Sequence, residues 1–178
     1  MIGRASERTA RLQDLASTGA GQQYGVLPWR KDRHGNVQVL LITSRTRGRW
    51  IVPKGWLSRG KAPCLSAALE AFEEAGVIGE VVSHPLASYR YVKQGEDGVR
   101  QHRRVTLFSL RVVGTLTNWP ERGQRKRRWF SLAEAADTVD DPELVRIVGA
   151  IRDEPLILME KHGRVSNADG CLESALTS

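Results

Sequence analysis

The sequence predicts an α/β fold in which helices flank a mixed β-sheet. Three observations carry this prediction. Apolar, β-branched residues fill 37–43, which is typical of a buried strand, and 63–75 has the pattern of a helix that ends at Gly76. Strand and helix patterns also follow one another in the order β-β-β-α-β-β-β-α-α. With 178 residues, of which 40% are hydrophobic, the chain can bury one sizeable core.

Local signals place the individual elements. We expect strands at 24–30, 37–43, 50–52, 80–92, 103–113 and 127–130. Ser131 and Glu134 fit a capping box at the start of a short helix, and Asp141 before Pro142 fits the start of another. The apolar residues of this last helix recur at helical spacing and should form one buried stripe: Leu144, Ile147, Val148 and Ile151.

The domain organisation is simple. We expect a flexible N-terminal arm at 1–22, one folded domain at 23–160 and a polar tail at 161–178. The first residues contain no apolar stretch of a secretory signal, and no apolar run approaches the length of a membrane span. Two cysteines are too few for a disulfide framework. These observations favour a cytoplasmic protein with no membrane partner.

The excess positive charge lies in the expected domain. The net charge is +7, and residues 1–22 carry +1 of it whereas residues 161–178 carry 0, which leaves +6 in 23–160. Such a balance favours a polyanionic ligand, which is a nucleic acid, a membrane surface or a densely phosphorylated small molecule. A solvated basic surface is the alternative.

The helix at 63–75 concentrates carboxylates. At about 100° per residue, Glu70, Glu73 and Glu74 fall within an arc of about 100°. Apolar side chains are expected on the opposite side, facing the core: Leu65, Ala68, Leu69 and Phe72. Hard cations such as Mg²⁺ or Mn²⁺ prefer several carboxylate oxygens and bind phosphates at the same time. A metal site is therefore one interpretation, and a solvated acidic face is the other.

At these residues the sequence resembles the Nudix hydrolase family. The family signature begins with Gly, has Glu six positions later, and ends in Arg-Glu, two further residues, Glu-Glu, one residue, Gly and an aliphatic residue. Gly55 matches the first position, and the second half is matched by Glu70, Glu73, Glu74, Gly76 and Val77. The signature's first Glu is Lys61 here, and its Arg is Leu69.

This resemblance implies an α/β/α sandwich and a metal-dependent pyrophosphohydrolase. It makes Glu70, Glu73 and Glu74 the ligands of Mg²⁺ or Mn²⁺, with Glu73 and Glu74 as the catalytic residues. Other segments resemble the diphosphoinositol polyphosphate phosphohydrolase branch: 43–45, 49–55, 101–104, 118–121 and 126–130. The implied partner is a small-molecule polyphosphate. Its expected binding residues are Arg45, Lys54, Gly55, Arg103 and Arg127, where Gly55 would let the backbone approach a phosphate.

Two other functions stay open. One is hydrolysis of a diadenosine or nucleoside polyphosphate, whose bases could stack on aromatic side chains: Trp29, Trp50, Trp56, Tyr89 and Tyr91. The simpler interpretation is that these aromatic residues belong to the core or its rim. A basic nucleic-acid-binding module on the same scaffold is favoured by Lys61 and Leu69. The clustered glutamates oppose it, because without a metal they repel a phosphate backbone, so we expect no nucleic-acid partner. The sequence does not predict an oligomeric state.

Overall fold

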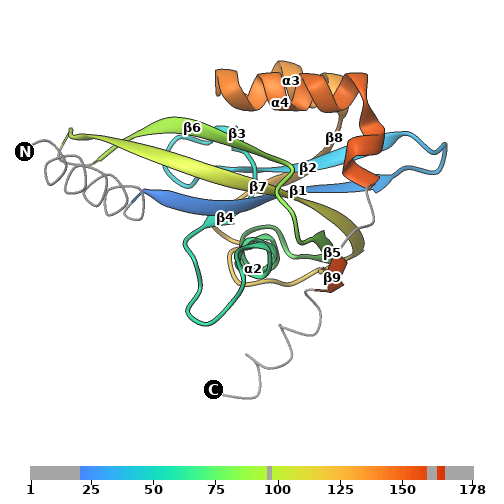
Figure 1. Cartoon of the computed structure of the whole chain (residues 1–178), viewed down its shortest axis with the longest axis horizontal. Helices are drawn as coiled ribbons and strands as arrows, with labels where there is room; N and C mark the ends of the chain where they lie inside the picture. The colour runs from blue at the N-terminus through green and yellow to red at the C-terminus, as the bar shows by residue number, and fades with distance from the viewer. Residues whose placement is uncertain (1–20, 96–97, 160–163, 167–178) are drawn as a thin grey trace, which may run out of the picture.

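The computed structural model describes residues 21–95, 98–159 and 164–166, and it has three layers (Figure 1). Helix α2 (Pro63–Ala75) covers one face of the β-sheet. Helices α3 (Leu132–Thr138) and α4 (Pro142–Asp153) cover the other face. The predicted α/β/α sandwich is confirmed.

The middle layer is one mixed sheet. The strands are β1 (Gln22–Lys31), β2 (Val37–Thr43), β3 (Trp50–Ile51), β4 (Lys54–Gly55), β5 (Val77–Val82), β6 (Ala87–Gln94), β7 (Arg100–Thr115), β8 (Arg127–Ser131) and β9 (Arg164–Ser166). Their order is β3-β2-β1-β7-β5-β9, with β4 also pairing with β1, β6 with β7, and β8 with β2. The central β1 and β7 are parallel, and the other strand pairs of the described chain are antiparallel.

The predicted strand at 80–92 is wrong, because it is two strands. β5 and β6 are separated at 83–86, where Pro85 has no N–H to continue a ladder. The strand expected at 103–113 is longer, since β7 forms a long hairpin with β6. The two-residue β4, the short helix η1 (Pro155–Met159) and β9 were not predicted.

The helix ends follow the predicted local signals. Gly76 takes the left-handed conformation (φ 60°) after α2 and donates its N–H to the Phe72 carbonyl at 3.0 Å. Ser131 and Glu134 form the capping box of α3, and Asp141 caps α4 through the N–H groups of the first turn. The predicted stripe of α4 packs into the core, with Leu144, Val148 and Ile151 buried and Ile147 partly buried.

The buried side of α2 differs from the prediction. The side chains that pack against the sheet are Cys64, Ala67, Ala68, Ala71 and Ala75, whereas Leu65, Leu69 and Phe72 are only partly buried. Small side chains let the helix axis approach the sheet closely, and the larger ones cover the flanks of the contact. This rotation turns the carboxylates toward β4 and away from open solvent.

The outer segments and surface complete the description. Strand β1 begins at Gln22, and β9 lies within the segment for which no element was predicted. Most of the proposed arm and tail, including Cys171, falls outside the described residues. No helix in the described parts is long and apolar enough to cross a membrane.

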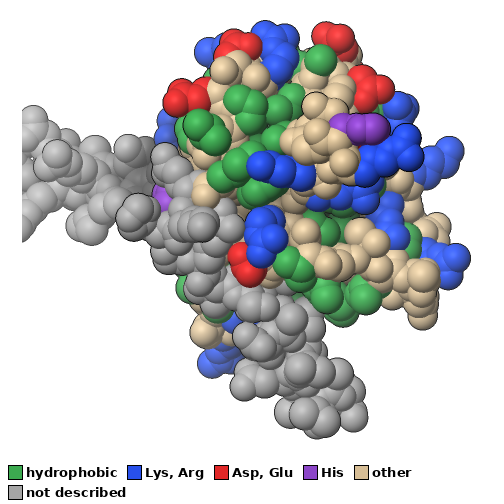
Figure 2. Space-filling view, turned by 90° about the vertical axis from the view of Figure 1, so that its right-hand side faces the viewer, with side chains coloured by type: hydrophobic (Ala, Val, Ile, Leu, Met, Phe, Trp, Pro, Cys, Tyr) green, Lys and Arg blue, Asp and Glu red, His purple; other side chains and the backbone are tan. Residues whose placement is uncertain are grey.

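Lys and Arg are spread over the end seen in Figure 2, with Asp and Glu mainly in its upper part, so the positive charge on this face is not one patch.

Candidate active site

Helix α2 brings its glutamates against strand β4. The Glu74 side chain is 7% exposed, whereas Glu70 and Glu73 are half-buried. A solvated acidic face, one of the two interpretations of these glutamates, does not hold for Glu74. The rotation of α2 described above is the reason, because it places the last turn of the helix beneath Lys54 and Gly55.

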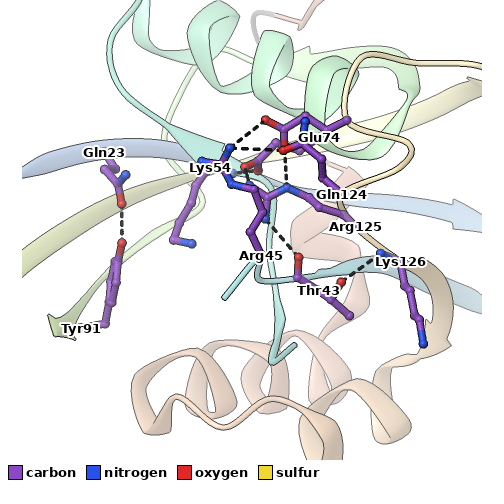
Figure 3. A network of polar contacts seen from close by, with 10 residues as sticks. Gln23, Thr43, Arg45, Lys54, Glu74, Tyr91, Gln124, Arg125 and Lys126 are labelled. Carbon is purple, nitrogen blue, oxygen red and sulfur yellow. Dashed lines mark hydrogen bonds and ion pairs between the residues drawn. The ribbon is translucent and has the colours of Figure 1, made fainter. Parts of the chain in front are cut away.

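Both carboxylate oxygens of Glu74 have partners (Figure 3). Its Oε2 accepts the backbone N–H of Lys54 at 3.0 Å. Its Oε1 is paired with Nη2 of Arg125, which comes from the segment between β7 and β8. Glu74 therefore ties the end of α2 both to β4 and to that segment.

Arg125 is the centre of the polar network. Its side chain is 6% exposed, and its Nε donates to Oε2 of Glu121 at 2.5 Å. Its Nη1 donates to the backbone carbonyl of Thr43 at 3.1 Å. The backbone N–H of Glu121 donates to the Glu73 carbonyl at 3.0 Å, which adds a fourth carboxylate beside the helix. Neither residue was among the predicted site residues, and within a basic run no local signal marks Arg125 as the buried member.

Gly55 makes room for a side chain. A Cβ atom on Gly55 would overlap the carboxylate of Glu70. Gly55 was expected to let the backbone approach a phosphate, and the structure gives it a different task, which is to let the Glu70 carboxylate lie against β4. The first residue of the signature, Gly55, is therefore in direct contact with its glutamate at position 70.

The Lys54 side chain leaves β4 away from Glu74 (Figure 3). Its Nζ lies 5.2 Å from the ring centroid of Tyr91, whose hydroxyl donates to Oε1 of Gln23 at 2.6 Å. Burial lowers the pKa of Lys54 to about 8, against the opposing effect of the nearby Glu74. The backbone of Lys54 thus belongs to the carboxylate cluster, while its side chain reaches the β6 side.

Arg45 and Arg103 lie at the edges of this arrangement. Arg45 is 59% exposed, and its Nη1 is 3.7 Å from Oε1 of Glu121. The Arg103 guanidinium lies 5.0 Å from the ring centroid of Trp56, which follows Gly55. Trp56 is 47% exposed, whereas Trp29 and Tyr89 are in the core. The structure therefore leaves Trp56 as the accessible ring beside the cluster, and Trp50 packs against Phe130 at 5.0 Å between centroids.

Arg127 is held by backbone carbonyls. Its Nη1 donates to the carbonyls of Ala75 at 2.6 Å and Gly76 at 3.1 Å, and its Nη2 donates to that of Leu116 at 2.7 Å. Its guanidinium also stacks on Trp119 at 3.9 Å. We expected Arg127 to bind substrate phosphate, but in this structure three of its donors are taken by the C-terminal carbonyls of α2 and the Leu116 carbonyl.

Replacing Arg127 by Gln is expected to lower the unfolding free energy by about 2 kcal/mol, because buried carbonyls lose charge-assisted hydrogen bonds. The KM for a polyphosphate substrate should stay within about twofold of the wild-type value, because three donors of the guanidinium are held by backbone carbonyls. Chemical denaturation and steady-state kinetics measure the two effects. A large rise in KM with unchanged stability would restore the substrate-binding role.

Comparison of the sequence with known protein families identifies the family. Residues 22–148 match the model of the NUDIX domain. This chain belongs to the Nudix family. Nudix enzymes hydrolyse phosphoanhydrides and generally use divalent metal ions, and the chain is a pyrophosphohydrolase of this family.

Similar Nudix proteins come from several organisms. Nudix hydrolase 16, mitochondrial, of Arabidopsis thaliana is 31% identical over 147 residues, covering 76% of this chain and 81% of that protein. Diphosphoinositol polyphosphate phosphohydrolase 3-beta of Bos taurus is 34% identical over 119 residues, covering 66% and 68% of the two chains. Across the plant relatives the match spans from 51% to 81% of their length. A solved C. elegans Ap4A hydrolase complex shares the fold, with a TM-score of 0.54 at 18% identity over 75% of this chain and 96% of that one.

The Nudix carboxylates carry more negative charge than their surroundings balance. Burial, together with the negative charges of Glu74, Glu73 and Glu121, raises the pKa of Glu70 to about 7. Burial and Glu121 also raise the pKa of Glu73. Burial raises the pKa of Glu74 too, although Arg125 and the Lys54 N–H act in the opposite direction. Hard oxygen donors with unbalanced negative charge fit Mg²⁺ or Mn²⁺ by their chemistry.

The side chains are not yet arranged as a closed metal site. Across the described residues, no group of three or more His, Cys, Asp or Glu side chains is placed so that it could hold a metal ion. Both oxygens of Glu74 accept hydrogen bonds in this arrangement.

Proposed function

We propose that this Nudix enzyme hydrolyses a phosphoanhydride bond of a highly anionic small molecule, with Glu70, Glu73 and Glu74 holding Mg²⁺ or Mn²⁺. The observation that carries the proposal is that Glu70 lies against Gly55 and Glu74 against the Lys54 N–H of the same short strand, while burial and neighbouring carboxylates raise the pKa values of all three glutamates. Such a cluster is costly in the absence of a cation and is stabilised by a divalent ion.

Different side chains of the protein would bind the metal, orient the water and bind the substrate. When bound, the metal ion polarises a phosphoryl oxygen and makes a bound water more acidic. Glu70 would bind it from beside Gly55, and the half-exposed Glu73 would orient the attacking water together with Glu74. Arg45 at the exposed rim, with Lys54 and Arg103, would neutralise phosphates of the substrate. Buried Arg125 and Glu121 would hold the segment 116–126 against α2.

The first choice of substrate is a diphosphoinositol polyphosphate. An inositol ring that carries many phosphates needs several separate cations, and the chain offers them from three segments in Arg45, Lys54 and Arg103. The similarity to diphosphoinositol polyphosphate phosphohydrolases supports this choice. A diadenosine or other nucleoside polyphosphate is the second candidate, favoured by the exposed ring of Trp56 beside the cluster.

A comparison of turnover tests the substrate class. Mg²⁺-dependent kcat/KM would be measured for diphosphoinositol pentakisphosphate, diadenosine tetraphosphate and diadenosine pentaphosphate, with Trp56→Ala as a matched variant. We expect the inositol compound to be the best substrate, and its kcat/KM to change little in Trp56→Ala. Preference for the dinucleotides, reduced at least about tenfold in Trp56→Ala by loss of a stacking contact, would replace the first candidate with the second.

A nucleic-acid-binding module is the function of a different class. Thermal unfolding with and without Mg²⁺ separates it from the enzyme, because a binder of nucleic acid needs no metal at the carboxylates. Its affinity for RNA would instead fall steeply with salt. We expect stabilisation by Mg²⁺ and its loss when Glu73 and Glu74 are both replaced by Gln.

A further inference from the structure

Arg125 supplies a buried positive charge beside Glu74. Its guanidinium is almost completely buried and is paired with Oε1 of Glu74 and Oε2 of Glu121. In Figure 3 it lies between the end of α2, carrying Glu74, and the Thr43 end of β2. The Nudix signature places its own arginine at 69, where this chain has Leu69. The guanidinium beside Glu74 therefore comes from a different segment of the chain.

A guanidinium and a divalent ion compete for the same carboxylate. Glu74 has two oxygens, and the Lys54 N–H uses Oε2 while Arg125 uses Oε1. A metal ligand must offer a lone pair that faces the ion, and two cations close to one oxygen repel each other strongly in a buried setting. A metal ion bound through Oε1 would therefore lie close to the Arg125 guanidinium and would weaken its pairing with Glu74.

We infer that Arg125 is the resident counter-cation of the metal-free site, and that a divalent ion binds by taking Glu74 from it. This inference rests on the proposed function, because it assumes that Glu74 is a metal ligand. Arg125 is a positioning residue in this scheme: it keeps the buried Glu74 charge paired before the metal arrives. Its contacts with Glu121 and the Thr43 carbonyl hold it near the site after Glu74 has changed partner.

In the wild type, part of the free energy of metal binding is used to break the pairing between Arg125 and Glu74. The variant Arg125→Gln has no such pairing to break. In that variant the metal-free protein loses the pairing of a buried carboxylate, so its Tm should fall by about 10 °C. Mn²⁺ should then bind about tenfold more tightly than to the wild type, which corresponds to about 1.4 kcal/mol. Saturating Mn²⁺ should restore most of the lost Tm. The electron paramagnetic resonance signal of free Mn²⁺ measures the affinity, and differential scanning calorimetry measures the Tm.

Two matched variants separate the exchange from simpler effects. Arg127→Gln removes a neighbouring engaged arginine without touching a carboxylate, so it should lower the Tm and leave Mn²⁺ affinity unchanged. Arg45→Gln removes a positive charge that lies 3.7 Å from Glu121 but leaves Glu74 paired, so its gain in Mn²⁺ affinity should be less than about twofold.

The outcomes distinguish the inference from the function on which it rests. Equal or weaker Mn²⁺ binding by Arg125→Gln would overturn the exchange while leaving the metal site intact. An equal gain in Arg45→Gln would also overturn it, because general electrostatics would then explain the effect. Absence of Mn²⁺ binding in the wild type and in all three variants would instead overturn the proposed metal site, and the inference with it.

Discussion

Gly55→Ala is expected to reduce metal-dependent turnover by at least about 100-fold, because a ligand displaced by even about 1 Å loses catalytic geometry. The added Cβ overlaps the Glu70 carboxylate, and Gly55 is itself buried and paired with Tyr24 of β1, so the backbone has little room to yield. The unfolding free energy should fall by no more than about 1 kcal/mol, because the overlapped atoms are the flexible end of the Glu70 side chain, which can move away. Initial rates at saturating Mg²⁺ and urea denaturation measure the two effects.

Gly149→Ala is the control for the first prediction. Gly149 lies in α4 with no heavy atom near the position of its missing Cβ. Adding the methyl group should leave turnover unchanged and raise stability by up to about 1 kcal/mol, since Ala favours the helix. Wild-type activity in Gly55→Ala would show that the close approach of Glu70 to β4 is not needed for function.

Glu73→Gln is expected to reduce turnover at least about 100-fold with the fold intact, because it removes one charged ligand. Glu73 is half-buried and lies near Glu121, which raises its pKa, so the charged side chain is repelled in the folded protein. The neutral amide relieves this repulsion, and the Tm without metal should therefore stay the same or rise. Kinetics at several Mg²⁺ concentrations and calorimetry without metal test both parts.

Ser88→Ala on the exposed side of β6 supplies a comparison for Glu73→Gln, because it changes a surface residue away from the carboxylates. It should not alter turnover. If Glu73→Gln lost activity only in proportion to a lower Tm, its role would be structural and the assignment of Glu73 as a metal ligand would be refuted.

Local chemistry explains which parts of the fold were predictable. The bounds of α2 and the caps at Gly76, Ser131 and Asp141 depend on neighbouring residues, and they were predicted correctly. The side of α2 that packs on the sheet depends on how closely two surfaces can approach. Periodicity favoured Leu65, Ala68, Leu69 and Phe72, and of these only Ala68 is buried, among the other small side chains of the contact.

In the site, too, residues fixed by a local motif were predictable and residues fixed by tertiary contacts were not. The Nudix signature identified Gly55 and the three glutamates, and the structure brings Glu70 to Gly55 and Glu74 to the adjacent Lys54 N–H. Arg125 and Arg127 have the same local composition around them, yet one pairs with Glu74 and the other with helix carbonyls. Their roles depend on where the segment 116–126 meets α2, which is a tertiary contact that no local pattern encodes.

Isotope transfer from water tests whether water attacks a phosphoanhydride in a metal-dependent reaction at the α2 carboxylates. The reaction would be run in ¹⁸O-labelled water with Mg²⁺, and the phosphate products analysed by mass spectrometry for the wild type and Glu73→Gln. We expect one ¹⁸O atom per cleaved bond with the wild type, no product above background with EDTA, and product formed at least about 100-fold more slowly with Glu73→Gln. Equal labelled product with EDTA, or from Glu73→Gln, would contradict this expectation.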